Sequence, residues 1–141
     1  MSPARGYAVR IEVANRNRVE SFTTLDGSTI RELAGRVRGH ACHQSLAEAI
    51  VNAGGETVEH RHRASEEIYY FVAGRGRLRL EEDEREVAAG DCVVIAPGTR
   101  HKLWAAPDGD LVLLCACSPP YRDDDTELTE APPSGGSARL P

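Results

Sequence analysis

From residue 58 onward the chain contains short runs of apolar and β-branched residues, separated by glycine, proline or charged turn-like stretches. The runs lie at residues 58–62, 68–72, 77–80, 92–95 and 111–117. In several of them polar and apolar side chains alternate, which is the two-residue period of a β-strand. β-branched and aromatic residues, which favour strands, are frequent among them. The pattern predicts an all-β fold for this part of the chain.

The N-terminal third has weaker strand signals. Residues 7–13 and 19–24 have the composition of two short strands, and Asp26-Gly27 is a typical tight turn into a third run at 28–33. Residues 45–51 alternate as a strand would, but their alanine and leucine content also fits a short helix. We expect the first 20 residues to form an arm that packs on the main domain or on another subunit.

Two histidines on one predicted strand provide the first chemical signal. His60 and His62 lie two residues apart in the run 58–62, so their side chains share one face. Turn-like residues follow, and the strong strand signal at 68–72 predicts that the chain reverses and brings Glu67 back beside the histidines. A His-x-His pair on its own also occurs as an ordinary polar strand face.

A second cluster, at residues 90–101, adds a third histidine to the pair. A Gly-Asp turn leads into a β-branched strand, which ends at Pro97-Gly98 and delivers His101. The two clusters together resemble the cupin superfamily. The first cupin motif is matched at Gly54, His60, His62, Glu67 and Gly74. The second is matched at Gly90, Gly98 and His101, although Pro97 lies one place late and Ala105 stands where asparagine is usual.

The resemblance implies a double-stranded β-helix, or jelly-roll, barrel and favours a strand at residues 45–51. The chain has 141 residues, room for one barrel, as in a monocupin. We expect an arm at residues 1–20, the barrel at 21–126 and a disordered tail at 127–141. The tail is predicted from its linker-like composition of proline, glycine and serine.

The resemblance also implies that His60, His62, Glu67 and His101 hold one divalent transition metal ion. Three imidazoles and one carboxylate suit Zn, Fe, Mn, Ni or Co, and this donor set does not choose among them. With a single anionic ligand the centre keeps a net positive charge, which polarises a carbonyl group or acidifies bound water.

Two tyrosines are candidate pocket residues. Tyr69 shares the strand face of Glu67, so it either donates a hydrogen bond or a proton to a substrate, or packs as a core aromatic. Tyr121 follows Pro119-Pro120, where the chain has to leave its sheet. We expect Tyr121 either to line the barrel opening or to pack on the outside. His40 and His43 are expected to be exposed loop residues.

Composition narrows the possible partners. The net charge is −5 and no basic block is present, which argues against a nucleic-acid surface. No run approaches the roughly 20 apolar residues of a membrane span, and no signal-peptide pattern begins the chain, so we expect a cytoplasmic protein that binds a small molecule. The four cysteines lack zinc-ribbon spacing and are expected to be small buried residues, with a reactive thiol at Cys115 or Cys117 as the alternative.

These observations favour a metal-dependent enzyme that acts on a small oxygenated metabolite, as a polyketide-cyclase-like or isomerase-like catalyst. The same ligands would serve an Fe- or Mn-dependent dioxygenase, and a non-catalytic small-molecule-binding cupin is the third alternative. Residues 111–117 are apolar on both faces, and Ile68, Tyr70 and Val72 add an outward apolar set. This excess of apolar surface predicts a homodimer.

Overall fold

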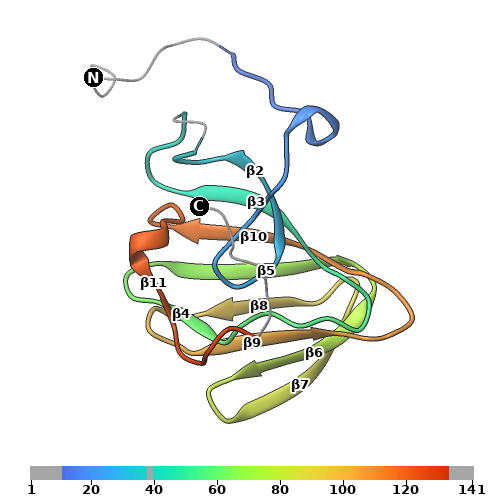
Figure 1. The fold of residues 1–141 in the computed structure, drawn as a ribbon. Helices are drawn as coiled ribbons and strands as arrows, with labels where there is room; N and C mark the ends of the chain where they lie inside the picture. The colour runs from blue at the N-terminus through green and yellow to red at the C-terminus, as the bar shows by residue number, and fades with distance from the viewer. Residues whose placement is uncertain (1–10, 38–39, 134–141) are drawn as a thin grey trace.

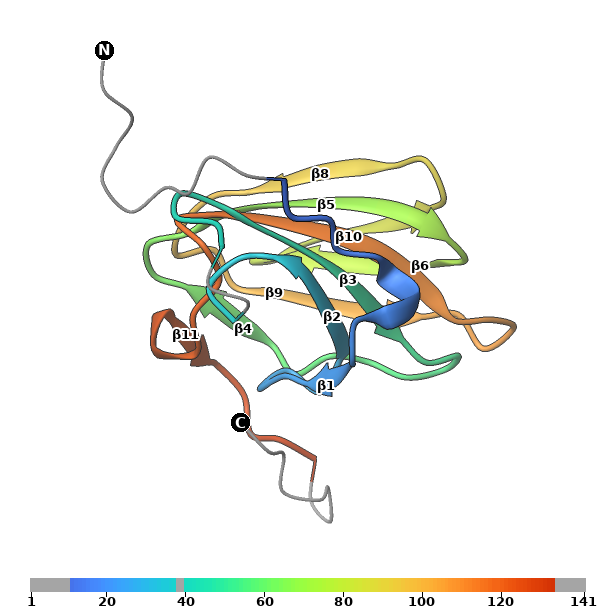
Figure 2. The ribbon, with the colours of Figure 1, turned by 90° about the horizontal axis from the view of Figure 1, so that it is seen from above.

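A computed structural model describes residues 11–37 and 40–133 of the protein. These residues fold into two antiparallel sheets that face each other (Figures 1 and 2). The first sheet has the order β1 (Phe22–Thr23), β2 (Thr29–Ala34), β3 (Ser45–Val51), β10 (Leu111–Ser118), β5 (Glu66–Ala73) and β8 (Cys92–Ile95). The second has the order β11 (Thr126–Leu128), β4 (His60–His62), β9 (His101–Ala105), β6 (Arg75–Leu80) and β7 (Asp83–Ala88). The predicted jelly-roll architecture is confirmed.

The side chains that point inward from each strand fill the space between the sheets. From Glu66 to Val72 in β5, buried and exposed residues alternate, with Glu67, Tyr69 and Phe71 inside and Ile68, Tyr70 and Val72 outside. Phe71 is fully buried, and the inward residues Leu111 and Leu113 of β10 pack in the same core. The strand, not the helix, is present at Ser45–Val51.

The outward face of the first sheet is apolar and only partly buried on this chain. The outward side chains of residues 111–117, which are apolar on both faces, are half-buried. The neighbouring outward residues Ile68 and Val94, which pair across β5 and β8, are 37% and 56% exposed. The reason is that the second sheet covers only one face of β10, so the other face remains open on this chain.

Both ends of the described chain differ from the predictions. Residues 11–13 are not a strand, residues 7–10 of the same prediction lie outside the described ranges, and β1 is only two residues long. Instead, the short 3₁₀ helix η1 (Arg16–Arg18) is attached to β3 by an ion pair of 2.9 Å between Arg16 and Glu48.

The disordered tail predicted from residue 127 is wrong for residues 127–130. A second 3₁₀ helix, η2 (Asp123–Asp125), leads into β11, which pairs with β4 (Figure 1). Glu130 then accepts a hydrogen bond of 2.9 Å from the Glu59 backbone N–H. Backbone pairing and charged contacts hold this segment in place. Its low apolar content therefore does not make it disordered. Residues 134–141 of the predicted tail lie outside the described ranges.

The turn between β5 and β6 requires glycine for two reasons. Gly74 has a φ of +83°, in the left-handed region that favours glycine. A Cβ atom at this position would also lie 2.2 Å from the backbone oxygen of Asp110. Gly90 offers a comparison, because its φ is similar at +96° but a Cβ atom would meet nothing within 4 Å.

We predict that Gly90→Ala lowers the free energy of unfolding by about 1–2 kcal/mol, the cost of left-handed backbone in a residue with a Cβ atom. Gly74→Ala is expected to lower it by clearly more, because the clash with Asp110 adds to the same backbone cost. Urea denaturation of both variants and the wild type measures the difference. Equal losses in the two variants would contradict the close approach at Gly74.

Candidate metal centre

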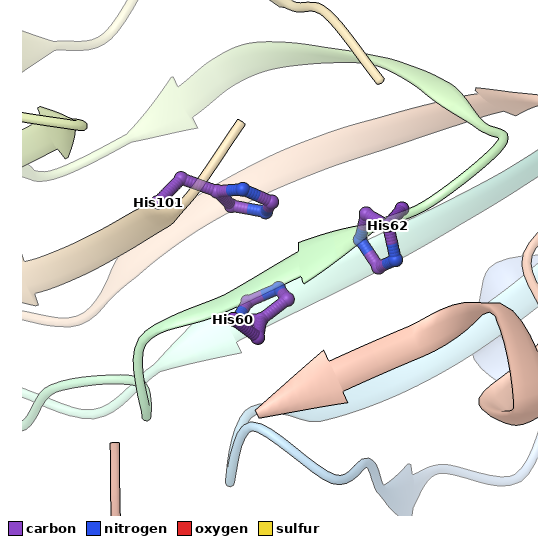
Figure 3. Close-up of side chains that lie close together, drawn as sticks. All are labelled: His60, His62 and His101. Atoms are coloured by element: carbon purple, nitrogen blue, oxygen red, sulfur yellow. The ribbon is translucent and has the colours of Figure 1, made fainter. Parts of the chain in front are cut away.

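Three buried histidines from two adjacent strands meet inside the barrel. His60 and His62 come from one face of β4, and His101, the first residue of β9, is paired with His60 in the sheet register. The ring centroids lie 5.2 Å apart for His60 and His62, 4.2 Å for His60 and His101, and 5.4 Å for His62 and His101. One nitrogen of each ring lies within 4.8 Å of the other two (Figure 3).

Hydrogen bonds to Nδ1 fix how two of the rings are protonated. His60 Nδ1 lies 2.8 Å from the carbonyl oxygen of Val58, and His101 Nδ1 lies 2.8 Å from that of Thr99. A carbonyl oxygen only accepts, so both Nδ1 atoms carry a proton and donate it. In the neutral rings Nε2 is then left with a free lone pair. Among the described residues, the buried His101 Nε2 has no hydrogen-bond partner.

Thr126 of β11 fixes the third ring in the same way. His62 Nδ1 lies 3.0 Å from Thr126 Oγ1, and that hydroxyl group donates its only proton to the carbonyl oxygen of Arg122 at 2.9 Å. The hydroxyl oxygen therefore accepts from His62 Nδ1–H, and Nε2 is again the inward atom. A partner on the remaining ring nitrogen is the arrangement that orients metal-bound histidines in proteins.

Glu67 brings a carboxylate to two of these Nε2 atoms. Its Oε1 lies 3.1 Å from His62 Nε2 and 3.4 Å from His101 Nε2, while Cys117 Sγ donates to Oε2 at 3.3 Å. Burial alone would raise the pKa of Glu67, but the neighbouring His101 and His62 imidazoles favour its charged form and hold that pKa well below its usual range. Glu67 is therefore an anion that faces imidazole nitrogens in a buried site.

The electrostatics of the cluster match a bound cation. Burial, followed by the influence of His101, lowers the pKa of His60 to about 4, so this ring is neutral near pH 7. Burial also opposes a charge on His62, but its hydrogen bond to Glu67 outweighs burial and raises the His62 pKa. A proton on His62 Nε2 would satisfy that pair, and a metal ion bound by both groups would replace it. The buried histidines His60, His62 and His101 therefore form a group that could hold a divalent transition metal ion. Glu67 lies beside two of them.

A further carboxylate at the site was not predicted from the sequence. Asp26, in the turn between β1 and β2, places Oδ2 3.6 Å from His60 Nε2. Burial would raise the pKa of Asp26, but His60 and hydrogen bonds from Ser28 and Thr24 lower it. The Asp26-Gly27 pair was interpreted only as a turn, and this interpretation is correct for the backbone. No local sequence signal indicates that the turn folds against β4.

Both candidate tyrosines lie at the cluster. The centroid of the buried Tyr69 ring is 5.9 Å from that of the His101 ring, and the Tyr121 and His62 rings form a T-shaped pair with centroids 5.7 Å apart. The Tyr121 hydroxyl group donates to Asp123 at 2.8 Å. Burial is the main cause that raises the pKa of each phenol, so both remain protonated near neutral pH.

The other candidate residues are divided between the cavity and the surface. Cys115 and Cys117 line the cavity, and burial raises the pKa of both thiols, which disfavours the reactive thiolate. Cys42 and Cys92 are exposed, so the expectation that all cysteines are buried is wrong. Cys42 lies in the loop before β3, and Cys92 is the exposed first residue of β8. His43 is exposed, as expected, but His40 is half-buried and its Nδ1 is shielded from solvent, so that part of the expectation is wrong.

The cavity beside the histidines has apolar walls and acidic polar groups. Apolar side chains from both sheets line it, including Phe22, Ile30, Leu103 and Leu113. Its charged lining residues are Asp26, Glu32 and Glu67, and within the described ranges no lysine or arginine lines it. Such a lining disfavours an anionic ligand, because a buried anion without a partner is costly.

Comparisons with known proteins agree with this architecture. Residues 47–117 match the family model described as the cupin domain. The chain therefore belongs to the cupin family. It is 43% identical to the uncharacterized protein MJ1618 of Methanocaldococcus jannaschii over 114 residues, which are 81% of this chain and 91% of that protein.

Solved structures share the fold at lower identity. The polyketide cyclase RemF from Streptomyces resistomycificus has a TM-score of 0.72 and 21% identity, over 87% of this chain and 88% of that chain. A Streptomyces PAC13 variant with uridine has a TM-score of 0.71 and 16% identity, over 86% and 92%. In the part of the chain that is described, no helix has the length and apolar character needed to cross a membrane.

Proposed function

We propose that this cupin is a metal-dependent enzyme that acts on a small, uncharged, oxygenated metabolite in a cyclase-like or isomerase-like reaction. His60, His62, Glu67 and His101 would hold one divalent transition metal ion. The observation that carries the proposal is the set of three buried Nε2 atoms, each fixed by a partner on Nδ1, beside the carboxylate of Glu67. Such a set would be costly in a purely structural core, because buried acceptors that face a carboxylate lack a donor or a cation to satisfy them.

A divalent ion held there would supply Lewis acidity toward a carbonyl or hydroxyl oxygen of the substrate. The chain's own residues would then control the surroundings of that oxygen. The apolar walls exclude water from the reacting group, and the Tyr69 phenol, kept protonated by burial, serves as a hydrogen-bond donor. The Tyr121 ring, held at the edge of His62, would confine the substrate on that side.

The fold is shared with a polyketide cyclase and with a protein that holds uridine, and we therefore put this reaction class ahead of the two alternatives. An Fe- or Mn-dependent dioxygenase would use the same ligands but would consume dioxygen when substrate is present. A non-catalytic binding protein would bind the ligand without turnover. An oxygen-electrode assay of the Fe- and Mn-loaded protein, run beside a product assay, separates the three classes.

Metal content tests the proposed ligands. We predict that wild-type protein holds close to one equivalent of a divalent transition metal, and that His60→Ala and His101→Ala lose most of it, because each removes one of four ligands. The control is His43→Ala, which changes an exposed histidine in the loop before β3 and should keep the wild-type content. Elemental analysis by mass spectrometry measures all four proteins. Unchanged metal in the His60 and His101 variants would contradict the ligand set.

We also propose that the protein forms a homodimer through the outer face of the first sheet. Leu46, Ile68, Tyr70, Val72 and Val94 are exposed on this face, and half-buried outward residues of β10 lie between them. A second copy of the same apolar face would cover it symmetrically.

Light scattering at micromolar concentration is expected to give twice the chain mass for wild type. Val94→Lys should shift the protein toward the monomer, because it places a charge in the apolar interface. Val37→Lys is the matched control, since Val37 is 67% exposed and lies in the loop between β2 and β3. A wild-type protein of the chain mass, or equal behaviour of the two variants, would contradict this interface.

A further inference from the structure

The Asp26 carboxylate divides its two oxygens between separate tasks. Oδ1 accepts hydrogen bonds from Thr24 Oγ1 at 2.7 Å, the Ser28 backbone N–H at 2.9 Å and Ser28 Oγ at 2.6 Å. The Asp26 backbone oxygen accepts from the Val58 N–H at 2.8 Å, which ties the turn to the segment just before β4. Oδ1 therefore stabilises the turn, and the backbone hydrogen bond fixes the turn against the segment before β4.

The second oxygen, Oδ2, is directed at the site and is 3.6 Å from His60 Nε2. His60 donates its Nδ1 proton to Val58, so Nε2 presents a lone pair. Two acceptors that face each other in a buried site do not stabilise each other. They are complementary to a hydrogen-bond donor or a cation that lies beside both.

The two carboxylates flank different histidines. Glu67 contacts His62 and His101, whereas Asp26 contacts His60 and is only 14% exposed. Glu67 thus has the geometry of a shared metal ligand, while Asp26 reaches a single member of the group. The cavity at this side is lined by Phe22 and Ile30, and it lacks lysine and arginine among the described residues. The surroundings of Oδ2 therefore suit an uncharged group that carries a hydrogen-bond donor.

We propose that Asp26 is a substrate-binding residue whose Oδ2 accepts a hydrogen bond from a hydroxyl group of an uncharged ring-containing ligand seated beside His60. This inference rests on the proposed function, because it places the ligand next to the metal ligands, but it assigns Asp26 to the ligand and not to the metal. Sequence motifs of the family do not include this position, since the first motif begins at Gly54.

Asp26→Asn tests the assignment with little change in shape. The amide oxygen can take the place of Oδ1 and keep the three hydrogen bonds of the turn, while the amide nitrogen replaces Oδ2 and donates where the carboxylate accepted. Ser28→Ala is the matched control, because it removes one donor to Oδ1 but leaves both carboxylate oxygens in place.

The probes are 4-fluorophenol, a small uncharged ring with one hydroxyl donor, and 4-fluoroanisole, in which a methyl group replaces the hydroxyl hydrogen. Fluorine NMR measures the affinity of each for the wild type and for both variants. Asp26→Asn is expected to weaken 4-fluorophenol binding about 10- to 100-fold, the effect of losing a hydrogen bond to a charged acceptor. Its affinity for 4-fluoroanisole and its metal content should equal those of wild type.

Several other outcomes would overturn the assignment. Loss of metal from Asp26→Asn, with metal retained in wild type, would make Asp26 a metal ligand. Equal weakening of both probes, or the same weakening in Ser28→Ala, would reduce Asp26 to a residue of the turn. Wild-type protein that does not bind 4-fluorophenol, or binds both probes equally, would also refute the proposal without any variant. If wild type binds no metal but the phenol preference depends on Asp26, the proposed metal function fails while this assignment stands.

Discussion

The geometry of the histidine cluster depends on three hydrogen bonds, each of which fixes the tautomer of one ring. Val58 and Thr99 each offer a carbonyl oxygen to the Nδ1–H of the histidine two residues later, so the extended backbone before His60 and before His101 orients its own ligand. The third bond comes from Thr126, far along the chain, and requires β11 to pair with β4. The barrel, the second motif and the C-terminal segment are thus all needed to direct the three Nε2 atoms to one point.

This constraint leaves an excess of acceptors in a buried space. Glu67 and Asp26 add carboxylates beside the three inward Nε2 atoms, and the described residues supply no lysine or arginine to the cavity wall. The proposed divalent cation would offset most of this excess, and the proposed ligand hydroxyl group would offset part of what remains. The charge balance of the cavity therefore links the proposed metal to the proposed class of substrate: an uncharged molecule with at least one hydroxyl group.

The sequence predicts the site where it depends on strand parity and fails where it depends on distant contacts. The two-residue spacing of His60 and His62, and the alternation along β5, predict correctly which side chains face inward. Asp26 was missed because its approach to His60 arises when the β1–β2 turn docks on a segment more than thirty residues away. The strand at Thr126 was missed because charged contacts and backbone pairing, not apolar residues, hold it. Both contacts join segments that are far apart in the sequence, so local sequence patterns do not predict them.

X-ray absorption spectroscopy of the metal-loaded protein is the sharpest test of the proposed metal centre, because it reports the atoms bound to the metal. We predict a first shell of nitrogen and oxygen only, near 2.0–2.1 Å if the metal is zinc, with the multiple-scattering signature of three imidazoles. We also predict that this signature falls to two imidazoles for the fraction of metal that His101→Ala retains. A sulfur atom near 2.3 Å, from Cys115 or Cys117, or a shell with fewer than three imidazoles in wild type, would contradict the proposed metal centre.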